Sequence, residues 1–221
     1  MKYPRTFHLP WSPGGTSDDK ILSSVDSFLG KHLIITEKMD GSNVCMETDS
    51  CFARSHASQP DHPSFNAFKA LHASIKNYIP ENMQIFGEWT YALHSIAYDK
   101  LPQYFLMFGV RVIRDEPNSH EWLSWNGVKG WADSLGLVTV PELAATRVLR
   151  DTDLQSIVES YTNSPSVYGP EREGVVIRVE DGFDDKYFSS NVAKWVRKNH
   201  VTTDDHWKFK EIVRNKLASG T

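Results

Sequence analysis

Short apolar runs of strand character dominate the middle of this sequence, and they do not alternate regularly with helical segments. The runs lie at 33–36, 44–47, 51–54, 83–89, 104–112, 174–179 and 192–196. The second and third of them flank a polar turn at 48–50, which is typical of a β-hairpin. Because parallel strands need a long crossover, usually a helix, this order predicts an α+β fold built on antiparallel sheet.

Apolar residues also recur at helical spacing in segments between and around these runs. The pattern predicts helices at 16–30, 65–75, 121–135, 152–161 and 205–217. Gly30 and Gly136 stand where two of these helices end, a position that favours a residue in the left-handed conformation. We expect the helices to flank the sheets.

The chain of 221 residues is long enough to bury one large core, and 40% of its residues are hydrophobic and 24% charged. Without repeats or linkers, it is expected to form a single domain over 1–221. Prolines, glycines and large aromatic residues in 1–15 indicate an ordered extended arm. The absence of a leader-like start and of a long apolar run leads us to expect a cytoplasmic protein without membrane contact.

Basic residues gather in the last part of the chain, although the formal net charge is −4. Eight lysines and arginines lie between 186 and 216, some of them in the short basic helix expected at 205–217. The net charge gives no general attraction to a polyanion. We therefore expect a nucleic-acid partner to meet this end of the chain.

Ionisable residues stand at the ends of several predicted strands. They are Glu37, Lys38, Asp40, Arg54, Glu88, Glu173 and Lys194. A lysine nucleophile, further cations for phosphate groups and two carboxylates for a divalent cation are what attack on a nucleoside triphosphate requires. Carboxylate oxygens favour a hard cation such as Mg²⁺. The set therefore predicts phosphoryl or nucleotidyl transfer.

Six short motifs in a fixed order carry a family resemblance. They are Glu37-Lys38-Met39-Asp40-Gly41-Ser42-Asn43, Ala53-Arg54-Ser55, Phe86-Gly87-Glu88-Trp89, Phe108-Gly109-Val110, Glu173-Gly174-Val175-Val176 and Ala193-Lys194-Trp195-Val196. Together they resemble the covalent nucleotidyltransferase superfamily, and within it the ATP-dependent RNA ligases of the phage type 2 group. The resemblance runs from about 31 to about 200. It implies two antiparallel β-sheets flanked by helices around an ATP cleft, without an OB domain.

The resemblance implies a role for each matched residue on the base side of the nucleotide. Lys38 would attack the α-phosphate of ATP and become a lysyl-adenylate. Glu37 and the adjoining strand would face the adenine. Phe108 would stack on one face of the base, and Val176 would lie on the other.

Polar residues of the motifs are implied to hold the sugar, the phosphates and a metal ion. Asn43 and Arg54 would bind the sugar and phosphate side of the adenylate, and later the 5′-phosphate end. Glu88 matches a ribose-contacting glutamate. Glu173 matches a glutamate that associates with the metal ion, either directly or through water. Lys194 matches a lysine that contacts the α-phosphate. The expected cofactors are therefore ATP and Mg²⁺ or Mn²⁺.

One motif departs from the family pattern. The family usually has a second lysine two residues after the position of Lys194, where this chain has Val196. Arg197 and Lys198 follow directly and are the candidates for its role. Together with Arg5 in the arm, they are the residues that we expect to bind nucleic acid.

The implied activity is that of an RNA ligase, which adenylates a 5′-phosphate end and seals it to a 3′-hydroxyl end. About twenty residues follow His200, too few for a five-stranded OB barrel, which disfavours a DNA ligase or a capping enzyme. A minimal ligase of this kind acts alone or depends on a partner such as an end-healing kinase or phosphatase. A non-catalytic module that binds nucleotides or RNA ends is the alternative of another class.

A lysine nucleophile must lose its proton, and the sequence neighbours of Lys38 oppose this. Glu37 and Asp40 stabilise the ammonium form. We therefore expect a bound metal ion and the cations Arg54 and Lys194, rather than the local sequence, to lower the pKa of Lys38.

Overall fold

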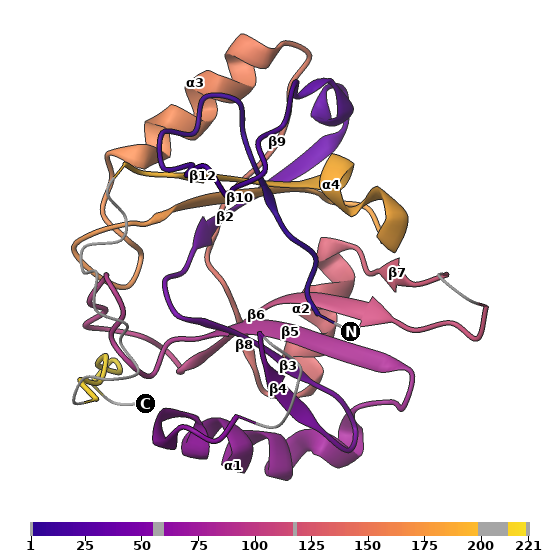
Figure 1. Ribbon diagram of the computed structural model, residues 1–221, viewed down its shortest axis with the longest axis vertical. Coiled ribbons are helices and arrows are strands. Elements are labelled where there is room, and N and C mark those ends of the chain that lie inside the picture. The colour runs from indigo at the N-terminus through magenta and orange to yellow at the C-terminus, as the bar shows by residue number, and fades with distance from the viewer. Residues whose placement is uncertain (1, 55–59, 117–118, 199–211, 220–221) are drawn as a thin grey trace.

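Two β-sheets face each other across the molecule, with helix α3 beyond one and helix α1 beyond the other (Figure 1). The computed structural model describes residues 2–54, 60–116, 119–198 and 212–219. The first sheet has the strand order β1-β12-β10-β2-β9. Its strands are β1 (Phe7–His8), β12 (Val192–Val196), β10 (Gly174–Val179), β2 (His32–Lys38) and β9 (Glu142–Arg147).

The second sheet has the strand order β11-β7-β6-β5-β3-β4, and β8 pairs with β6. Its strands are β11 (Phe183–Asp184), β7 (Glu121–Trp122), β6 (Phe105–Val112), β5 (Met83–Trp89), β3 (Ser42–Met46), β4 (Cys51–Ala53) and β8 (Val138–Thr139). In the part of the chain that the structure describes, paired strands are antiparallel apart from β1–β12 and β6–β8. The predicted α+β fold with two largely antiparallel sheets is therefore confirmed.

Helices α1 and α3 cover the outer sides of the two sheets (Figure 1). The α-helices are α1 (Asn66–Ile75), α2 (Trp125–Ser134), α3 (Asp151–Thr162) and α4 (Phe188–Asn191). Single 3-10 turns are η1 (Asp26–Phe28), η2 (Pro63–Phe65), η3 (Lys76–Tyr78) and η4 (Asp185–Tyr187). Ser124 caps α2, because its hydroxyl accepts from the Gly127 N–H at 3.1 Å. Among the described residues, none of the helices is both long and apolar enough to cross a bilayer.

Alternation along β2 decides which side chains reach the space between the sheets. Leu33 and Ile35 pack into the core that also contains residues of α3. Ile34 packs instead with the core of the second sheet. Because successive side chains of a strand point to opposite faces, Lys38 shares the face of Ile34. The strand thus carries its terminal lysine to the side that faces the second sheet.

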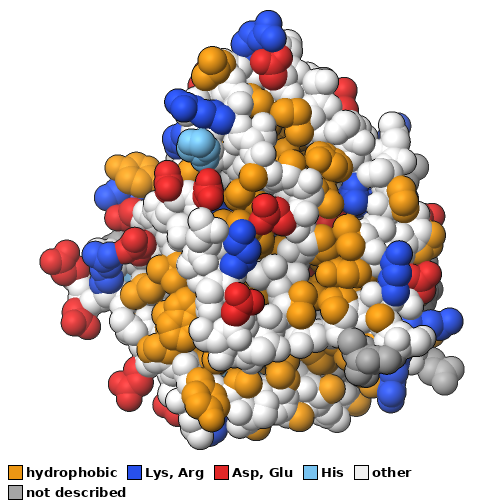
Figure 2. All heavy atoms as spheres, turned by 180° about the vertical axis from the view of Figure 1, so that it is seen from behind, with side chains coloured by type: hydrophobic (Ala, Val, Ile, Leu, Met, Phe, Trp, Pro, Cys, Tyr) orange, Lys and Arg blue, Asp and Glu red, His pale blue; other side chains and the backbone are white. Residues whose placement is uncertain are grey.

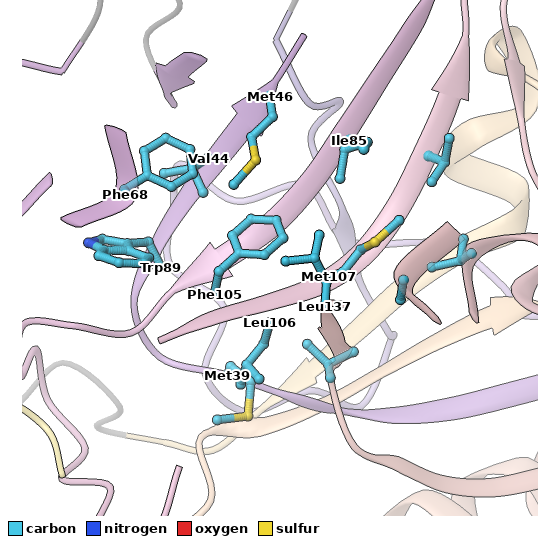
Figure 3. Close-up of a cluster of buried hydrophobic side chains, with 14 of the residues drawn as sticks. Met39, Val44, Met46, Phe68, Ile85, Trp89, Phe105, Leu106, Met107 and Leu137 are labelled. Carbon is cyan, nitrogen blue, oxygen red and sulfur yellow. The ribbon is translucent and has the colours of Figure 1, made fainter. Parts of the chain in front are cut away.

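The second sheet is held by a dense buried core. Side chains of β3, β5 and β6 point towards one another there, together with Phe68 of α1 and Leu137 (Figure 3). Full burial of a large apolar side chain such as Phe105 stabilises the fold by about 1.5–3 kcal/mol. Met39 lies in the same core. Since Met39 follows Lys38 directly, the core anchors the end of the strand that carries the lysine.

The helix predicted at 16–30 is absent from the structure, which has only η1 in that described stretch. Ile21 instead forms a parallel bridge with His8, and the Leu22 N–H donates to the His8 carbonyl at 2.8 Å. Pairing with the N-terminal arm therefore overrides the helical spacing of the apolar residues. Gly30 does have the positive φ expected of it, at 76°.

Two other predicted helices also differ from the structure. The helix expected at 121–135 begins only at Trp125, because the preceding residues form β7 and pair with β6. Residues 212–219 are not helical, since Arg214 and Leu217 form bridges with Ala92 and Leu101. The remaining part of that predicted helix, 205–211, lies outside the described residues.

Candidate active site

Lys38 lies at the end of β2 and faces the start of β10. It pairs in register with Gly174, so Glu173 lies directly beside its side chain. The Lys38 Nζ atom donates to Glu173 Oε2 at 2.6 Å. The Glu173 side chain is 6% exposed and that of Lys38 is 25% exposed. The amine is therefore the member of this pair that a ligand can reach more easily.

A glycine after Glu173 is required by the close approach of neighbouring strands. A Cβ atom at Gly174 would clash with the carbonyl oxygen of Trp195 in β12. The absence of a side chain lets β10 lie between β2 and β12. This packing fixes Glu173 opposite Lys38.

Glu88 brings a second carboxylate to the lysine from the other sheet. It lies on β5, in register with Asn43 on β3. Burial raises the pKa of Glu88 to about 8, while the charge of Lys38 lowers it and those of Glu173 and Asp40 raise it. Because these charges act on one another, Lys38, Glu88 and Glu173 form one electrostatic site.

The carboxylates determine the protonation state of Lys38. Burial lowers the pKa of Lys38, but Glu173, Glu88 and Asp40 together outweigh burial and raise it above its ordinary value. The side chain is therefore an ammonium in the free protein. The direction agrees with the expectation from the neighbouring acids, although the largest carboxylate effects come from Glu173 and Glu88.

The side chain of Glu37 lies on the opposite face of β2 from Lys38. Its Oε2 atom accepts from the Val167 N–H at 2.9 Å and lies 3.5 Å from Arg172 Nη2. Strand alternation turns this side chain away from the second sheet. The Glu37 side chain therefore points away from the second sheet, and a contact of Glu37 and its strand with the adenine stays a prediction.

Asp40 builds the turn that follows the lysine. Its Oδ2 atom accepts from the backbone N–H groups of Ser95 and Ile96 at 2.7 and 2.8 Å. Its own N–H donates to the Tyr98 hydroxyl at 2.8 Å. These bonds tie the turn between β2 and β3 to the segment after β5, so the position of Lys38 depends on Asp40.

Lys194 supplies a second cation from β12. It lies in register with Val176 on β10, and its Nζ atom is 3.5 Å from Asp19 Oδ1. Burial lowers the pKa of Lys194 and Lys38 lowers it further, whereas Asp19 raises it. The two lysines therefore act on the same space.

Asp19 is a partner that the sequence motifs do not indicate. Its Oδ2 atom accepts from the N–H and the hydroxyl of Thr16 at 3.1 and 3.0 Å. Its Oδ1 atom lies 3.5 Å from His8 Nε2 and 3.5 Å from Lys194 Nζ. The Thr-x-x-Asp spacing indicates a local turn, but no local signal places that turn beside β12.

Phe108 on β6 and Val176 on β10 are half-buried residues of the two different sheets. Both pack against an aromatic cluster that contains Phe86, Trp122 and Phe188. A partly exposed aromatic ring and an aliphatic side chain that share one cluster can together contact a planar base. The structure thus brings this pair of predicted residues together.

A family model described as RNA ligase matches residues 31–196. The chain belongs to the RNA ligase family. The matched part contains the six motifs, from Lys38 in the first to Lys194 in the last. A comparison with curated protein sequences finds no match.

Solved RNA ligase structures share the fold. A point mutant of Naegleria gruberi RNA ligase with ATP and Mn is 16% identical, with a TM-score of 0.55 over 82% of this chain and 54% of that chain. Another mutant, with AMP and Mn, is 17% identical, with a TM-score of 0.54 over 80% and 53%. An archaeal ATP-dependent RNA ligase is 14% identical, with a TM-score of 0.54 over 89% and 48%. This RNA ligase family member thus spans about half the length of these structures.

Two predicted residues of the RNA ligase motifs, Asn43 and Arg54, lie on β3 and just after β4. The Asn43 Oδ1 atom is buried and has no hydrogen-bond partner among the described residues. It is therefore an acceptor that a ligand hydroxyl can satisfy. Arg54 is exposed, and no hydrogen bond or ion pair between described residues joins it to the Lys38 cluster.

The residues after Lys194 differ in what they can offer to a phosphate. Val196 is buried in β12 and has no polar group. The Arg197 Nη2 atom pairs with Glu171 at 2.7 Å. Lys198 is exposed. Arg197 would have to break its ion pair with Glu171 in order to bind a phosphate. Among the described ion pairs there is none that involves Lys198, so Lys198 is the better candidate for the role of the missing second lysine.

Basic side chains are expected to meet nucleic acid, and Arg5 of the N-terminal arm is one of them. Arg5 is exposed, and its Nη1 atom donates to the Asp18 carbonyl at 2.8 Å. On the face seen in Figure 2, lysine and arginine side chains are scattered among acidic ones. Lys208 and Lys210, which belong to the basic C-terminal part, lie outside the described residues.

The carboxylates near Lys38 can contribute to a cation site only in part. Within the described ranges, no cluster of three or more His, Cys, Asp or Glu side chains is placed to hold a metal ion. Burial raises the pKa of both Glu88 and Glu173, and a nearby cation would offset that cost. The donors therefore fit a hard cation that takes its other ligands from a nucleotide and water.

Proposed function

We propose that this protein is an ATP-dependent RNA ligase that forms a lysyl-AMP intermediate on Lys38. The observation that carries the proposal is the convergence of Lys38, Glu173, Glu88 and Lys194, from both sheets, on one space. Membership of the RNA ligase family supports it. The shared fold with RNA ligases that were solved with ATP or AMP and Mn also supports it.

In the proposed first step, the Lys38 amine attacks the α-phosphorus of ATP. A P–N bond forms, the P–O bond to the β-phosphate breaks, and pyrophosphate leaves with the electrons of that bond. The amine gives up a proton to solvent, which its 25% exposed side chain can reach. Lys194 balances the charge that develops on the oxygens of the α-phosphate.

In the free protein, Lys38 is a poor nucleophile because the carboxylates hold its ammonium form. A bound Mg²⁺ or Mn²⁺ supplies positive charge that neutralises these carboxylates and the phosphates. Glu173, directly or through water, is the residue that would hold the ion, and Glu88 offers a further carboxylate for the ribose. Phe108 and Val176 hold the base, and Asn43 accepts from a sugar hydroxyl.

Two further steps complete the proposed reaction. A 5′-phosphate oxygen of an RNA end attacks the phosphorus of lysyl-AMP, so the P–N bond breaks and Lys38 regains its proton. The product is an RNA end joined to AMP through a pyrophosphate bridge. A 3′-hydroxyl then attacks the RNA-side phosphorus of that bridge and gives up its proton to solvent. A phosphodiester bond forms, the bond from that phosphorus to the bridging oxygen breaks, and AMP leaves.

RNA is the proposed acceptor, and the support for it is membership of the RNA ligase family. We also propose a cytoplasmic location and a possible partner that heals RNA ends, such as a kinase or a phosphatase. A DNA ligase or a capping enzyme would use the same lysine with another acceptor. A module that only binds nucleotides would keep the cleft and form no covalent adduct.

Intact-mass measurement after incubation with ATP and Mg²⁺ tests the covalent step. The expected result is a gain of one AMP in the wild-type protein and in Lys129→Ala, a control at a partly exposed lysine of α2 that pairs with Glu142. The Lys38→Ala variant should gain nothing. An unchanged mass of the wild-type protein would contradict the enzyme and favour the binding module.

Labelled 5′-phosphate substrates then test the acceptor. RNA, DNA and nicked hybrid duplexes, each with a 3′-hydroxyl partner, are incubated with the adenylated protein, and sealed products are separated by length. We expect sealing of the substrates whose broken strand is RNA. Preferential sealing of DNA would assign the same lysine chemistry to a DNA ligase.

A further inference from the structure

The N-terminal arm, residues 2–15, connects the two sheets (Figure 1). Its strand β1 pairs with β12 of the first sheet, with Phe7 opposite Ala193 and His8 opposite Lys194. From β1 the chain continues towards its N-terminus across the space between the sheets and reaches the second sheet (Figure 1). The arm therefore ends beside the strands that carry the base-side residues.

Tyr3 of the arm packs against side chains of the second sheet. Its ring packs against four other aromatic rings, at centroid distances between 5.1 and 5.3 Å. These rings are Phe86, Phe108, Trp122 and Phe188. Phe86 and Trp122 are buried, whereas Phe108 is only half-buried. Tyr3 thus joins the predicted base-stacking ring to a rigid buried cluster.

The contact with Phe108 has a defined geometry. The two ring centroids are 5.1 Å apart and the ring planes are at 72°, an edge-to-face arrangement. A Cβ atom at Gly109 would lie 3.9 Å from Tyr3 Cε2, so the tyrosine also lies over the backbone next to Phe108. The Phe108 carbonyl accepts from Arg178 Nη1 at 3.2 Å. Ring and backbone of Phe108 are therefore both held from the side of the arm and of β10.

Charged residues of both sheets act on the Tyr3 hydroxyl. Burial raises the pKa of Tyr3, and the charge of Glu88 raises it further, while Arg178 and a hydrogen bond with Thr6 lower it. Glu88 is the carboxylate that we assign to the ribose. Tyr3 thus lies within the electrostatic range of both the base-side and the ribose-side residues.

We infer that Tyr3 is a positioning residue of the nucleotide site, which holds the Phe108 ring in the plane that the base needs for stacking and thereby sets the affinity for ATP. The inference rests on the proposed function. It assigns Tyr3 no part in bond making, because Lys38 and the α-phosphate lie at the other end of the nucleotide. A loss of the ring should therefore raise the KM for ATP and leave the rate of adenylate formation at saturation little changed.

The test compares Tyr3→Leu and Tyr3→Phe with the wild-type protein. Leucine keeps an apolar side chain but removes the ring, and phenylalanine keeps the ring contacts. Tyr78→Leu is the matched control, since Tyr78 is 72% exposed. Rates of lysyl-AMP formation are measured by intact mass over a range of ATP concentrations, and the melting temperature of each variant checks that it folds.

We expect about a tenfold rise in the KM for ATP in Tyr3→Leu, with a saturating rate within about twofold of the wild type. Tyr3→Phe should restore the wild-type KM. Pyrophosphate carries no base, so its KM in the reverse reaction should stay the same in Tyr3→Leu. An unchanged or lower KM for ATP in Tyr3→Leu would overturn the inference, and a lower value would indicate that Tyr3 obstructs the site.

A double-mutant cycle with Phe108→Leu keeps the test decisive if Tyr3→Leu is less stable than expected. When Phe108 is already leucine, Tyr3→Leu should raise the KM for ATP by less than about twofold. Full additivity of the two changes would contradict the inference, because Tyr3 would then act independently of Phe108. Failure of the wild-type protein to form any adduct would instead refute the proposed function.

Discussion

The Lys38 Nζ atom lies 2.6 Å from Glu173 Oε2, so the proposed nucleophile is paired with the carboxylate that precedes its strand partner Gly174. This pairing keeps the amine oriented and charged at once. The charge has to be removed before the amine can attack a phosphorus atom. The reactivity of Lys38 is therefore tied to the charge of the groups around Glu173.

Glu173→Gln should shift the pH dependence of lysyl-AMP formation to lower pH. Burial lowers the pKa of Lys38, but the Glu173 charge is the largest contribution that raises it, so its removal lets the amine deprotonate at lower pH. The saturating rate should also fall, because the oriented hydrogen bond is weakened. Rates measured by intact mass over about three pH units around neutrality check this. Glu171→Gln, at an exposed acid on the same segment, should leave the profile in place.

Glu88 should make the ligand-free protein less stable as the pH rises. Its pKa is raised by burial from 4.5 to about 8, so the folded state binds a proton that the unfolded state has lost between these values. The stability contribution is complete below pH 4.5 and is lost as the pH rises through about 8. Glu88→Gln should therefore be more stable than the wild type at pH 8, by on the order of 4 kcal/mol, and similar at pH 4. Denaturant unfolding at both pH values measures this, and an equal difference at both would contradict it.

Asp19→Asn should narrow the pH range over which the protein forms lysyl-AMP, by lowering the upper pH limit of that range. Burial and Lys38 lower the pKa of Lys194, and Asp19 opposes them. Without the Asp19 charge, Lys194 loses its proton at lower pH, and the positive charge offered to the α-phosphate is lost with it. The alkaline limb of lysyl-AMP formation should move to lower pH. Asp18→Asn removes an equal charge from the exposed neighbouring residue and should not move that limb.

Arg172→Ala should destabilise the protein strongly without direct effect on the chemistry. The Arg172 and Glu37 side chains are 4% and 0% exposed and lie 3.5 Å apart, so the substitution leaves a buried carboxylate uncompensated. Loss of one member of a buried ion pair costs about 3–5 kcal/mol. Denaturant unfolding measures the change. Arg150→Ala breaks the exposed pair with Asp153 and should give no measurable change in the free energy of unfolding. Equal effects of the two variants would contradict the stabilising role of the buried Arg172–Glu37 pair.

The part of the fold that the sequence predicts best is the part in which local pattern and tertiary pairing agree. The apolar runs predict β2, β5, β6 and β10, and Lys38 indeed stands at a strand end. The edge strand β9 is not predicted, because Glu142–Arg147 has no strand-like alternation of polar and apolar residues, and none of its residues is fully buried in the structure. Its strand conformation comes from pairing with β2.

In the candidate site, too, residues of local motifs can be predicted, whereas residues placed by distant pairing cannot. The motifs predict Lys38, Glu88, Glu173 and Lys194, and the geometry brings them together. Asp19 cannot be predicted, because its pairing with Lys194 joins segments that are far apart along the chain. The helical spacing that predicts a helix at 16–30 is genuine, but the backbone of His8 competes for Ile21 and Leu22 and forms the better pairing.

The parallel pairing of β1 with β12 has a consequence for synthesis of the protein on the ribosome. Strand β1 leaves the ribosome long before β12, its neighbour in the sheet, and contacts between segments so far apart along the chain form slowly. A nascent chain released before Glu173 would carry Lys38 without Glu173 or Lys194. Prematurely terminated translation products are therefore expected to be inert towards ATP.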